Sequence, residues 1–131
     1  MICVGLDLKF WPDVKGAVQD ALDGNGGRIC SDELLKLIKE NKAQLWGLHD
    51  GVLRAVMVTE IINYPQLKAI RIIAVGGRDM DMWLDTLIDT IGRWGAGQGA
   101  HVMEFVGRRG WEKKLTSKGF GELQIFMTRR I

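Results

Sequence analysis

A glycine pair at the end of an apolar run is the feature of this sequence best suited to chemistry. Residues 69–75 are almost all apolar, which predicts a strand buried on both faces. Gly76, Gly77 and Arg78 follow at once, and apolar residues at helical spacing begin at Leu84. Such a junction between a strand and a helix offers backbone N–H groups and positive charge to an anion. The junction is therefore a candidate phosphate site.

The acidic residues of the following helix favour a different interpretation. Asp79 and Asp81 stand in its first turn, and Asp81, Asp85 and Asp89 recur every four residues along one stripe. Like charges at this spacing repel, so the stripe must face water, a cation or a basic partner. One helix face seldom supplies enough ligands for a metal, and we predict no metal site. On this interpretation the glycine pair is a tight turn, and Asp79 or Asp81 caps the helix. The acidic stripe then faces solvent, and the alternative is that it contacts a protein partner.

Charge and composition narrow the class of protein. With 131 residues, 47% hydrophobic and 26% charged, the chain is typical of a soluble globular domain. No apolar run approaches the roughly twenty residues that span a bilayer, and residues 1–4 do not resemble a signal peptide, so we expect a cytoplasmic location. Cys3 and Cys30 lack metal-ligand spacing, and pairing between them stays open. The net charge of +2 does not by itself indicate a polyanion partner.

The C-terminal third is basic, in contrast to the acidic helix before it. After Gly107 the only acidic residues are Glu112 and Glu122, against seven lysines and arginines. Of the five tryptophans only Trp111 lies among cations, whereas a nucleic-acid platform interleaves several aromatics with basic residues. We therefore favour two solvated faces, assign the tryptophans to core packing and consider nucleic acid an unlikely partner.

The remaining elements follow from periodicity and turn signals. Helical spacing after Pro12 and after Ser31 predicts two helices, and Asp50-Gly51 between two apolar runs predicts a hairpin. The expected strands are residues 2–8, 44–49, 52–62, the run ending at 75, 101–106 and 123–128, with further helices after residue 79 and over 107–118. The order is β-α-α-β-β-β-α-β-α-β. It predicts a single α/β domain over residues 1–131, a mixed sheet with helices on its faces and a parallel crossover around the acidic helix.

This order resembles the GNAT (acyl-CoA N-acyltransferase) fold across almost the whole chain. Residues 111–120, a Trp-containing helix ending in Gly-Phe, resemble the closing helix of that family. The resemblance implies that the fourth strand, its loop and the next helix bind the pyrophosphate of acetyl-CoA, which assigns the cofactor to Val75, Gly76, Gly77 and Arg78. It also implies a fifth strand that splays from the fourth, so that pantetheine lies between them.

The loop departs from the motif of the family it resembles, Gln/Arg-x-x-Gly-x-Gly/Ala. If Arg78 takes the first place, Asp81 and Trp83 fall where glycine and glycine or alanine are used. An aspartate adds a like charge beside a phosphate, and a tryptophan fills space that the ligand needs. We therefore expect a degenerate cofactor loop.

The resemblance implies that an amine attacks the thioester directly, with a carboxylate or a water relay taking its proton. Glu60, near the end of the third expected strand, and Glu104, on the fifth, are the candidate general bases. Each has a structural alternative: Glu60 pairs with Arg54 or Arg71, and Glu104 faces solvent.

A tyrosine on the last helix often protonates the leaving thiolate in this family. Aligning the Gly-Phe ending places Leu115 at that position, and the only tyrosine, Tyr64, lies in a turn. The acid role is therefore unfilled.

Two functions remain. The first is a GNAT-like binding or structural component with a degenerate loop and a protein partner at the acidic stripe. Residues 107–115, Gly-Arg-x-Gly-Trp-x-x-x-Leu, resemble small proteins encoded by tailed phages, which implies virion association. The alternative is an active N-acetyltransferase that transfers an acetyl group from acetyl-CoA to an amine.

Overall fold

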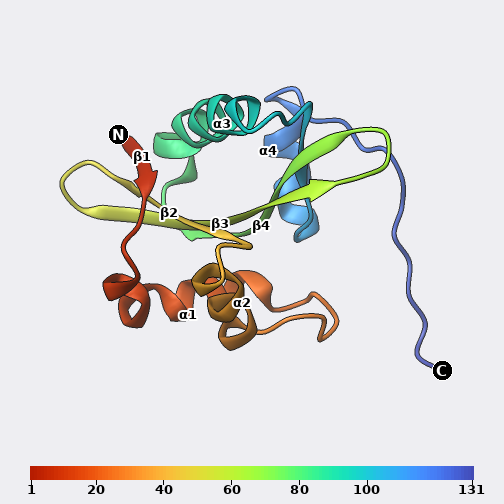
Figure 1. The fold of residues 1–131 in the computed structure, drawn as a ribbon, viewed down its shortest axis with the longest axis horizontal. Helices are drawn as coiled ribbons and strands as arrows, with labels where there is room; N and C mark the ends of the chain where they lie inside the picture. The colour runs from red at the N-terminus through yellow and green to blue at the C-terminus, as the bar shows by residue number, and fades with distance from the viewer.

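The computed structural model describes residues 1–131 and contains one five-stranded sheet in the order β1-β2-β3-β4-β5 (Figure 1). Neighbouring strands are antiparallel except β4 and β5, which form the expected parallel pair. The α/β class and the GNAT-like order are confirmed as far as α4. The elements are β1 (Ile2–Gly5), the 3-10 turn η1 (Leu8–Phe10), α1 (Trp11–Leu22), α2 (Ser31–Lys39), β2 (Gln44–His49), β3 (Leu53–Asn63), β4 (Lys68–Gly77), α3 (Met80–Gly97), β5 (Val102–Phe105), the 3-10 turn η2 (Arg109–Trp111) and α4 (Glu112–Thr116).

Helices cover both faces of the sheet. Helices α1 and α2 lie on one face, and α3 lies on the other with α4 beside it (Figure 1). Between α3 and the sheet, Trp83 and Ile91 pack with Ile70 in one buried cluster; on the opposite face Val18 and Leu34 belong to a second. Strands β3 and β4 contribute to both clusters, which explains why β4 reads as a continuous apolar run.

The two sides of β4 are paired over different lengths. Toward β3, Val58 faces Ala74 and Thr59 faces Ile72, so Ile73 is an extra residue that forms a β-bulge. Toward β5, pairing ends at Ile72 and Phe105, beyond which the two strands part. The expected splay of the fifth strand is therefore present, and it begins at the bulge.

Two expectations for the C-terminal third are wrong. The helix expected over residues 107–118 is reduced to the 3-10 turn η2 and the short α4. The strand expected over residues 123–128 is not formed: residues 117–131 contain no helix or strand, and residues 121–131 are exposed throughout. A strand needs a hydrogen-bonding neighbour, and this segment does not lie along β5, whose outer edge is free.

Two further properties of the chain concern its cysteines and its helices. Cys3 is buried and Cys30 exposed, and both are free thiols. Burial raises the pKa of the Cys3 thiol to about 11. None of the helices is both long enough and apolar enough to cross a membrane.

Candidate functional site

A groove of about 380 Å³ opens where β4 and β5 part. Its walls come from the second half of β4, the segment that follows β5, and the C-terminal half of α1. All four residues predicted for the cofactor line it, namely Val75, Gly76, Gly77 and Arg78. The sequence prediction therefore identifies one wall of a depression in the surface, and the binding of acetyl-CoA by these four residues stays a prediction.

The glycine pair has a packing role at this wall. Both glycines belong to β4, opposite Val56 and Ala55 of β3, so their interpretation as a tight turn is wrong. A Cβ atom on Gly76 would lie 3.0 Å from the carbonyl oxygen of Ala17 in α1, and one on Gly77 would lie 2.6 Å from the Cβ atom of Ala55. At Gly77 a side chain does not fit, and at Gly76 helix α1 would have to shift by a few tenths of an ångström to admit one. Packing alone therefore accounts for both glycines, whether or not a ligand binds.

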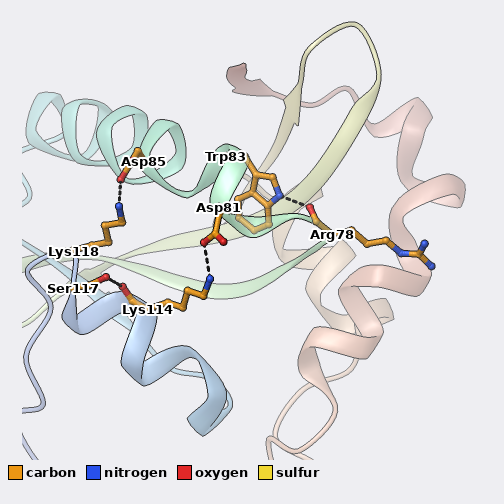
Figure 2. A network of polar contacts seen from close by, with 7 residues as sticks. All are labelled: Arg78, Asp81, Trp83, Asp85, Lys114, Ser117 and Lys118. Carbon is orange, nitrogen blue, oxygen red and sulfur yellow. Dashed lines mark hydrogen bonds and ion pairs between the residues drawn. The ribbon is translucent and has the colours of Figure 1, made fainter.

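Arg78 leads from the groove into α3. Its guanidinium makes no hydrogen bond or ion pair within the protein, and it points away from the acidic residues of α3 (Figure 2). Asp79 occupies the N-cap position in the left-handed conformation, with φ 56°, and its side chain accepts no hydrogen bond from the helix. The expected side-chain cap is therefore absent, and the positive end of α3 lies beside an unpaired cation.

Asp81 and Trp83, the two residues expected to hinder cofactor binding at the loop, do not face the groove. Trp83 is 1% exposed, packs in the core under α3, and donates its indole N–H to the carbonyl oxygen of Arg78 at 2.7 Å. The carboxylate of Asp81 accepts a hydrogen bond from Lys114 Nζ at 2.6 Å (Figure 2). That hydrogen bond is the main reason why the pKa of Asp81 lies below its usual value. Neither side chain lines the groove.

The acidic stripe of α3 faces the chain's own basic helix. Lys114 pairs with Asp81, and Lys118, just after α4, pairs with Asp85 at 2.7 Å (Figure 2). Asp89 forms no ion pair, so part of the stripe remains unpaired. The acidic and basic segments noted in the sequence therefore neutralise one another in part. A protein partner at the Asp81, Asp85 and Asp89 stripe stays a prediction.

A polar row crosses the sheet just beyond the inner end of the groove. The strand registers place Glu60 opposite Arg71, and Arg71 opposite Glu104, on β3, β4 and β5. Glu104 Oε2 accepts hydrogen bonds from Arg71 Nε at 3.1 Å and from the Tyr64 hydroxyl at 3.0 Å. Arg71 Nη2 also donates to the Tyr64 hydroxyl at 2.8 Å. Glu104 therefore belongs to a hydrogen-bond network. The alternative that its side chain faces solvent is wrong.

Glu60 is the unbonded carboxylate of this row. Its side chain makes no hydrogen bond or ion pair: Arg54 pairs with Asp50, and Arg71 pairs with Glu104. Burial is the main reason why the pKa of Glu60 is raised; the charge of Arg71 lowers it and that of Glu104 raises it further. A half-buried carboxylate with free lone pairs and a raised pKa has the properties of a general base.

No side chain fills the acid role. Leu115 is 5% exposed and packs within the fold, and the Tyr64 hydroxyl already donates to Glu104. The Tyr64 network could not be read from the sequence, because Tyr64 and Glu104 are forty residues apart and meet only through the strand register.

The wall of the groove opposite β4, formed by residues 105–108 and Trp111, could not be predicted from the sequence either. Arg108 donates from Nε to the carbonyl oxygen of Asp23 at 3.3 Å and from Nη2 to that of Asp20, which ties the segment after β5 to the end of α1. Phe105 and Trp111 line the same wall, with ring centroids 5.5 Å apart. A basic, glycine-rich run carried no signal for this placement.

Solved acetyltransferase structures share this architecture over nearly the whole chain. A ribosomal-protein-alanine N-acetyltransferase from Brucella melitensis matches with a TM-score of 0.73 and 14% identity, over 99% of this chain and 100% of that one. A predicted acetyltransferase with acetyl-CoA from Clostridium acetobutylicum matches with a TM-score of 0.75 and 11% identity, over 98% and 94%. A glucosamine-6-phosphate N-acetyltransferase from Arabidopsis thaliana matches with a TM-score of 0.66 and 13% identity, over 98% of this chain and 96% of that one.

No family model and no curated protein matches the sequence. None of the three neighbours comes from a phage, so the phage likeness of residues 107–115 finds no support among them. At 11–14% identity the likeness concerns the fold alone, and the acceptors named for two neighbours differ from each other. Within that limit, the chain has the GNAT fold.

Proposed function

We propose that the protein binds acetyl-CoA in the groove between β4 and β5 and transfers the acetyl group to an amine. The observation that carries this proposal is the groove itself: Val75, Gly76, Gly77 and Arg78 line it, whereas Asp81 and Trp83 do not. The departures from the family motif therefore leave the binding surface clear. The neighbour solved with acetyl-CoA supports the choice of ligand.

The groove offers partners for the pyrophosphate and the pantetheine of this ligand. Arg78, which lines the groove and forms no ion pair within the protein, supplies positive charge for the pyrophosphate. Beyond Ile72 the β5-facing edge of β4 has no paired strand, so its backbone groups are free for the amides of pantetheine. Phe105 and Trp111 give the opposite wall an apolar surface.

We assign the polar row of Glu60, Arg71 and Glu104 a part in the reaction. Arg71 precedes Ile73, at the inner end of the groove, by two residues, or about 7 Å along the strand. The bound thioester would supply an activated acyl carbon. In the transfer, the amine nitrogen would bond to that carbon and Glu60 would take the amine proton. The carbon–sulfur bond would break with its electron pair on sulfur, and the CoA thiolate would leave and take a proton from water. We assign Glu104 a positioning role, because its contacts hold Arg71 and Tyr64.

A second candidate is the binding or structural component that the sequence favoured. The observation in its favour is the unfilled acid role, since Leu115 lacks a proton to give and the Tyr64 hydroxyl is bonded within the row. A protein of this kind binds the cofactor, or a ligand of similar chemistry, without turnover.

Release of free CoA thiol from acetyl-CoA in the presence of a panel of primary amines separates the two functions. The enzyme predicts amine-dependent thiol release, lowered about a hundredfold in kcat by Glu60→Gln with unchanged acetyl-CoA affinity. The control is Glu40→Gln, a change to an exposed residue at the end of α2. Binding without thiol release for any amine would favour the second candidate.

A further inference from the structure

The side chain of Arg108 crosses the candidate groove from one wall to another. Its backbone belongs to the segment after β5, and its guanidinium donates to the carbonyl oxygens of Asp20 and Asp23 at the end of α1. Arg108 and Asp20 both line the groove, and they belong to these two different walls. A ligand that fills the space between the walls must therefore displace this bridge.

The contacts that hold the bridge are easily exchanged. The hydrogen bond from Arg108 Nε to Asp23 is 3.3 Å long, beyond the usual length of about 2.9–3.0 Å. Both acceptors are neutral carbonyl oxygens, and Arg108 forms no ion pair with a carboxylate. A guanidinium has several N–H donors, and its charge-assisted bonds to phosphate are about twice as strong as bonds between neutral groups. An anion in the groove therefore competes with α1 for this side chain.

The charges along the groove favour an anionic ligand. The charged residues that line it are Asp20, Arg78 and Arg108, so cations outnumber anions there. The Arg78 guanidinium likewise has no partner within the protein. The next arginine along the chain is placed differently, because Arg109 lies outside the groove and pairs with Glu112 at 3.6 Å. Of two adjacent arginines, the fold thus directs one to the groove and the other away from it.

We propose that Arg108 is a second phosphate-binding residue of the groove, held by α1 until a phosphate-bearing ligand enters. The inference rests on the proposed function, because it takes acetyl-CoA as that ligand. On binding, the guanidinium leaves the carbonyl oxygens of Asp20 and Asp23 and pairs with a phosphate oxygen of the ligand. Every ligand between the walls breaks the bridge, but only one that carries phosphate gives Arg108 a new partner. Arg108 thereby selects phosphate-bearing thioesters over phosphate-free ones.

NMR titration of the isotope-labelled full-length chain with two thioesters tests the inference. Acetyl-CoA carries phosphates, whereas S-acetylpantetheine has the same thioester and pantetheine without them. Arg108→Met should weaken acetyl-CoA binding about tenfold or more, because a charge-assisted contact is lost. The same variant should bind S-acetylpantetheine about twofold more tightly or better, because no bridge has to be broken. Arg109→Met is the matched control and should leave both affinities within about twofold of the wild type.

The signs of the two effects distinguish this role from a structural one. Equal weakening of both thioesters would show that Arg108 only maintains the shape of the groove. Tighter binding of both would show that no phosphate reaches Arg108, and unchanged affinities would show that the bridge does not obstruct the groove. Each of these three results overturns the inference. Arg108→Lys, which keeps the charge but not the fork of donors, is the second variant and should weaken acetyl-CoA binding less than Arg108→Met does. Circular dichroism establishes that the variants are folded.

Inorganic pyrophosphate separates a failure of this inference from a failure of the proposed function. The wild type should bind it with a shift of the Arg108 Nε–H signal, and Arg108→Met should weaken that binding whereas Arg109→Met should not. If these effects occur but acetyl-CoA does not bind, the proposed function is wrong and the role of Arg108 in binding phosphate stands. If acetyl-CoA binds equally to the wild type and to Arg108→Met, the inference alone is wrong. No difference between the two variants with pyrophosphate would overturn it as well.

Discussion

The two halves of β4 are both largely apolar, but their surroundings differ. Residues Ala69–Ile72 are paired on both sides, with β3 and β5, and carry the Arg71 network. Beyond the bulge at Ile73, residues 74–77 are paired only with β3, and their other edge faces the groove. The difference arises at one bulge and at the end of one short strand. A buried apolar strand thus gains an open edge because its neighbouring strand ends.

The largest effect is expected where the open half of β4 packs most tightly. Gly77→Ala should lower the free energy of unfolding by about 1–3 kcal/mol, because the new Cβ meets Ala55 and the Arg54 carbonyl oxygen at 2.6 Å. Urea unfolding measures the change. Gly16→Ala in α1, where a Cβ meets nothing within 4 Å, is the control and should raise the same quantity by about 0.5–1 kcal/mol. Equal effects at the two glycines would refute the close approach of β3 and β4.

In the doubly paired half, Arg71→Met should cost about 1–2 kcal/mol of unfolding free energy, since Glu104 and Tyr64 both lose a donor. The exposed pair of Lys15 and Asp32, 3.0 Å apart, supplies the control: Lys15→Met should change stability by less than about 0.5 kcal/mol. A similar small loss for Arg71→Met in thermal and urea unfolding would mean that the row contributes no more than a surface ion pair.

The pH dependence of stability tests the state of Glu60. Its pKa in the folded protein is raised above the usual 4.5, so the folded state holds this proton more tightly than the unfolded state does. Stability should therefore fall as pH rises from 4.5 through the folded-state pKa, and level off above it. Urea unfolding from pH 4 to 8 should show that the unfolding free energy of Glu60→Gln rises relative to that of the wild type over the same pH interval. A difference between the two proteins that does not vary with pH would show that Glu60 is fully solvated.

The smallest effect is expected at the α3–α4 ion pairs. The side chains of Lys118 and Asp85 are 35% and 72% exposed, so Lys118→Ala should cost less than about 1 kcal/mol. Raising the salt concentration should reduce that cost further, because it screens exposed charges. Thermal unfolding at low and high salt makes the comparison. A loss insensitive to salt would indicate that Lys118 acts through packing against α3.

Local sequence patterns predict most of the helices and strands. The register of the strands determines which side chains meet at the candidate site. The helices α1, α2 and α3, the β2–β3 hairpin and the apolar part of β4 up to Val75 all follow from spacing and turn residues that act over a few positions. The Tyr64–Glu104 contact and the placement of Arg108 against α1 depend on strand register and on where β5 ends, which no local pattern encodes.

The position of Trp83 illustrates the same limit. Aligned to a motif, Trp83 falls at a loop position that should be small, but helical spacing turns its ring into the core. The failure at residues 123–128 has a different cause. The pattern of a strand is present there, but a strand also needs an edge to pair with, and the single chain does not bring that edge to it.

The most direct test of the central claim is a calorimetric titration of the full-length protein with acetyl-CoA. Saturable binding is expected, with Arg78→Ala weakening it about tenfold or more through the loss of a charge-assisted contact. Arg109→Ala is the control, because Arg109 is exposed and pairs with Glu112 outside the groove. Asp81→Ala should leave the affinity within about twofold, since Asp81 faces Lys114. No heat of binding at millimolar acetyl-CoA, or equal affinity in the Arg78 and Arg109 variants, would contradict the assignment of the groove.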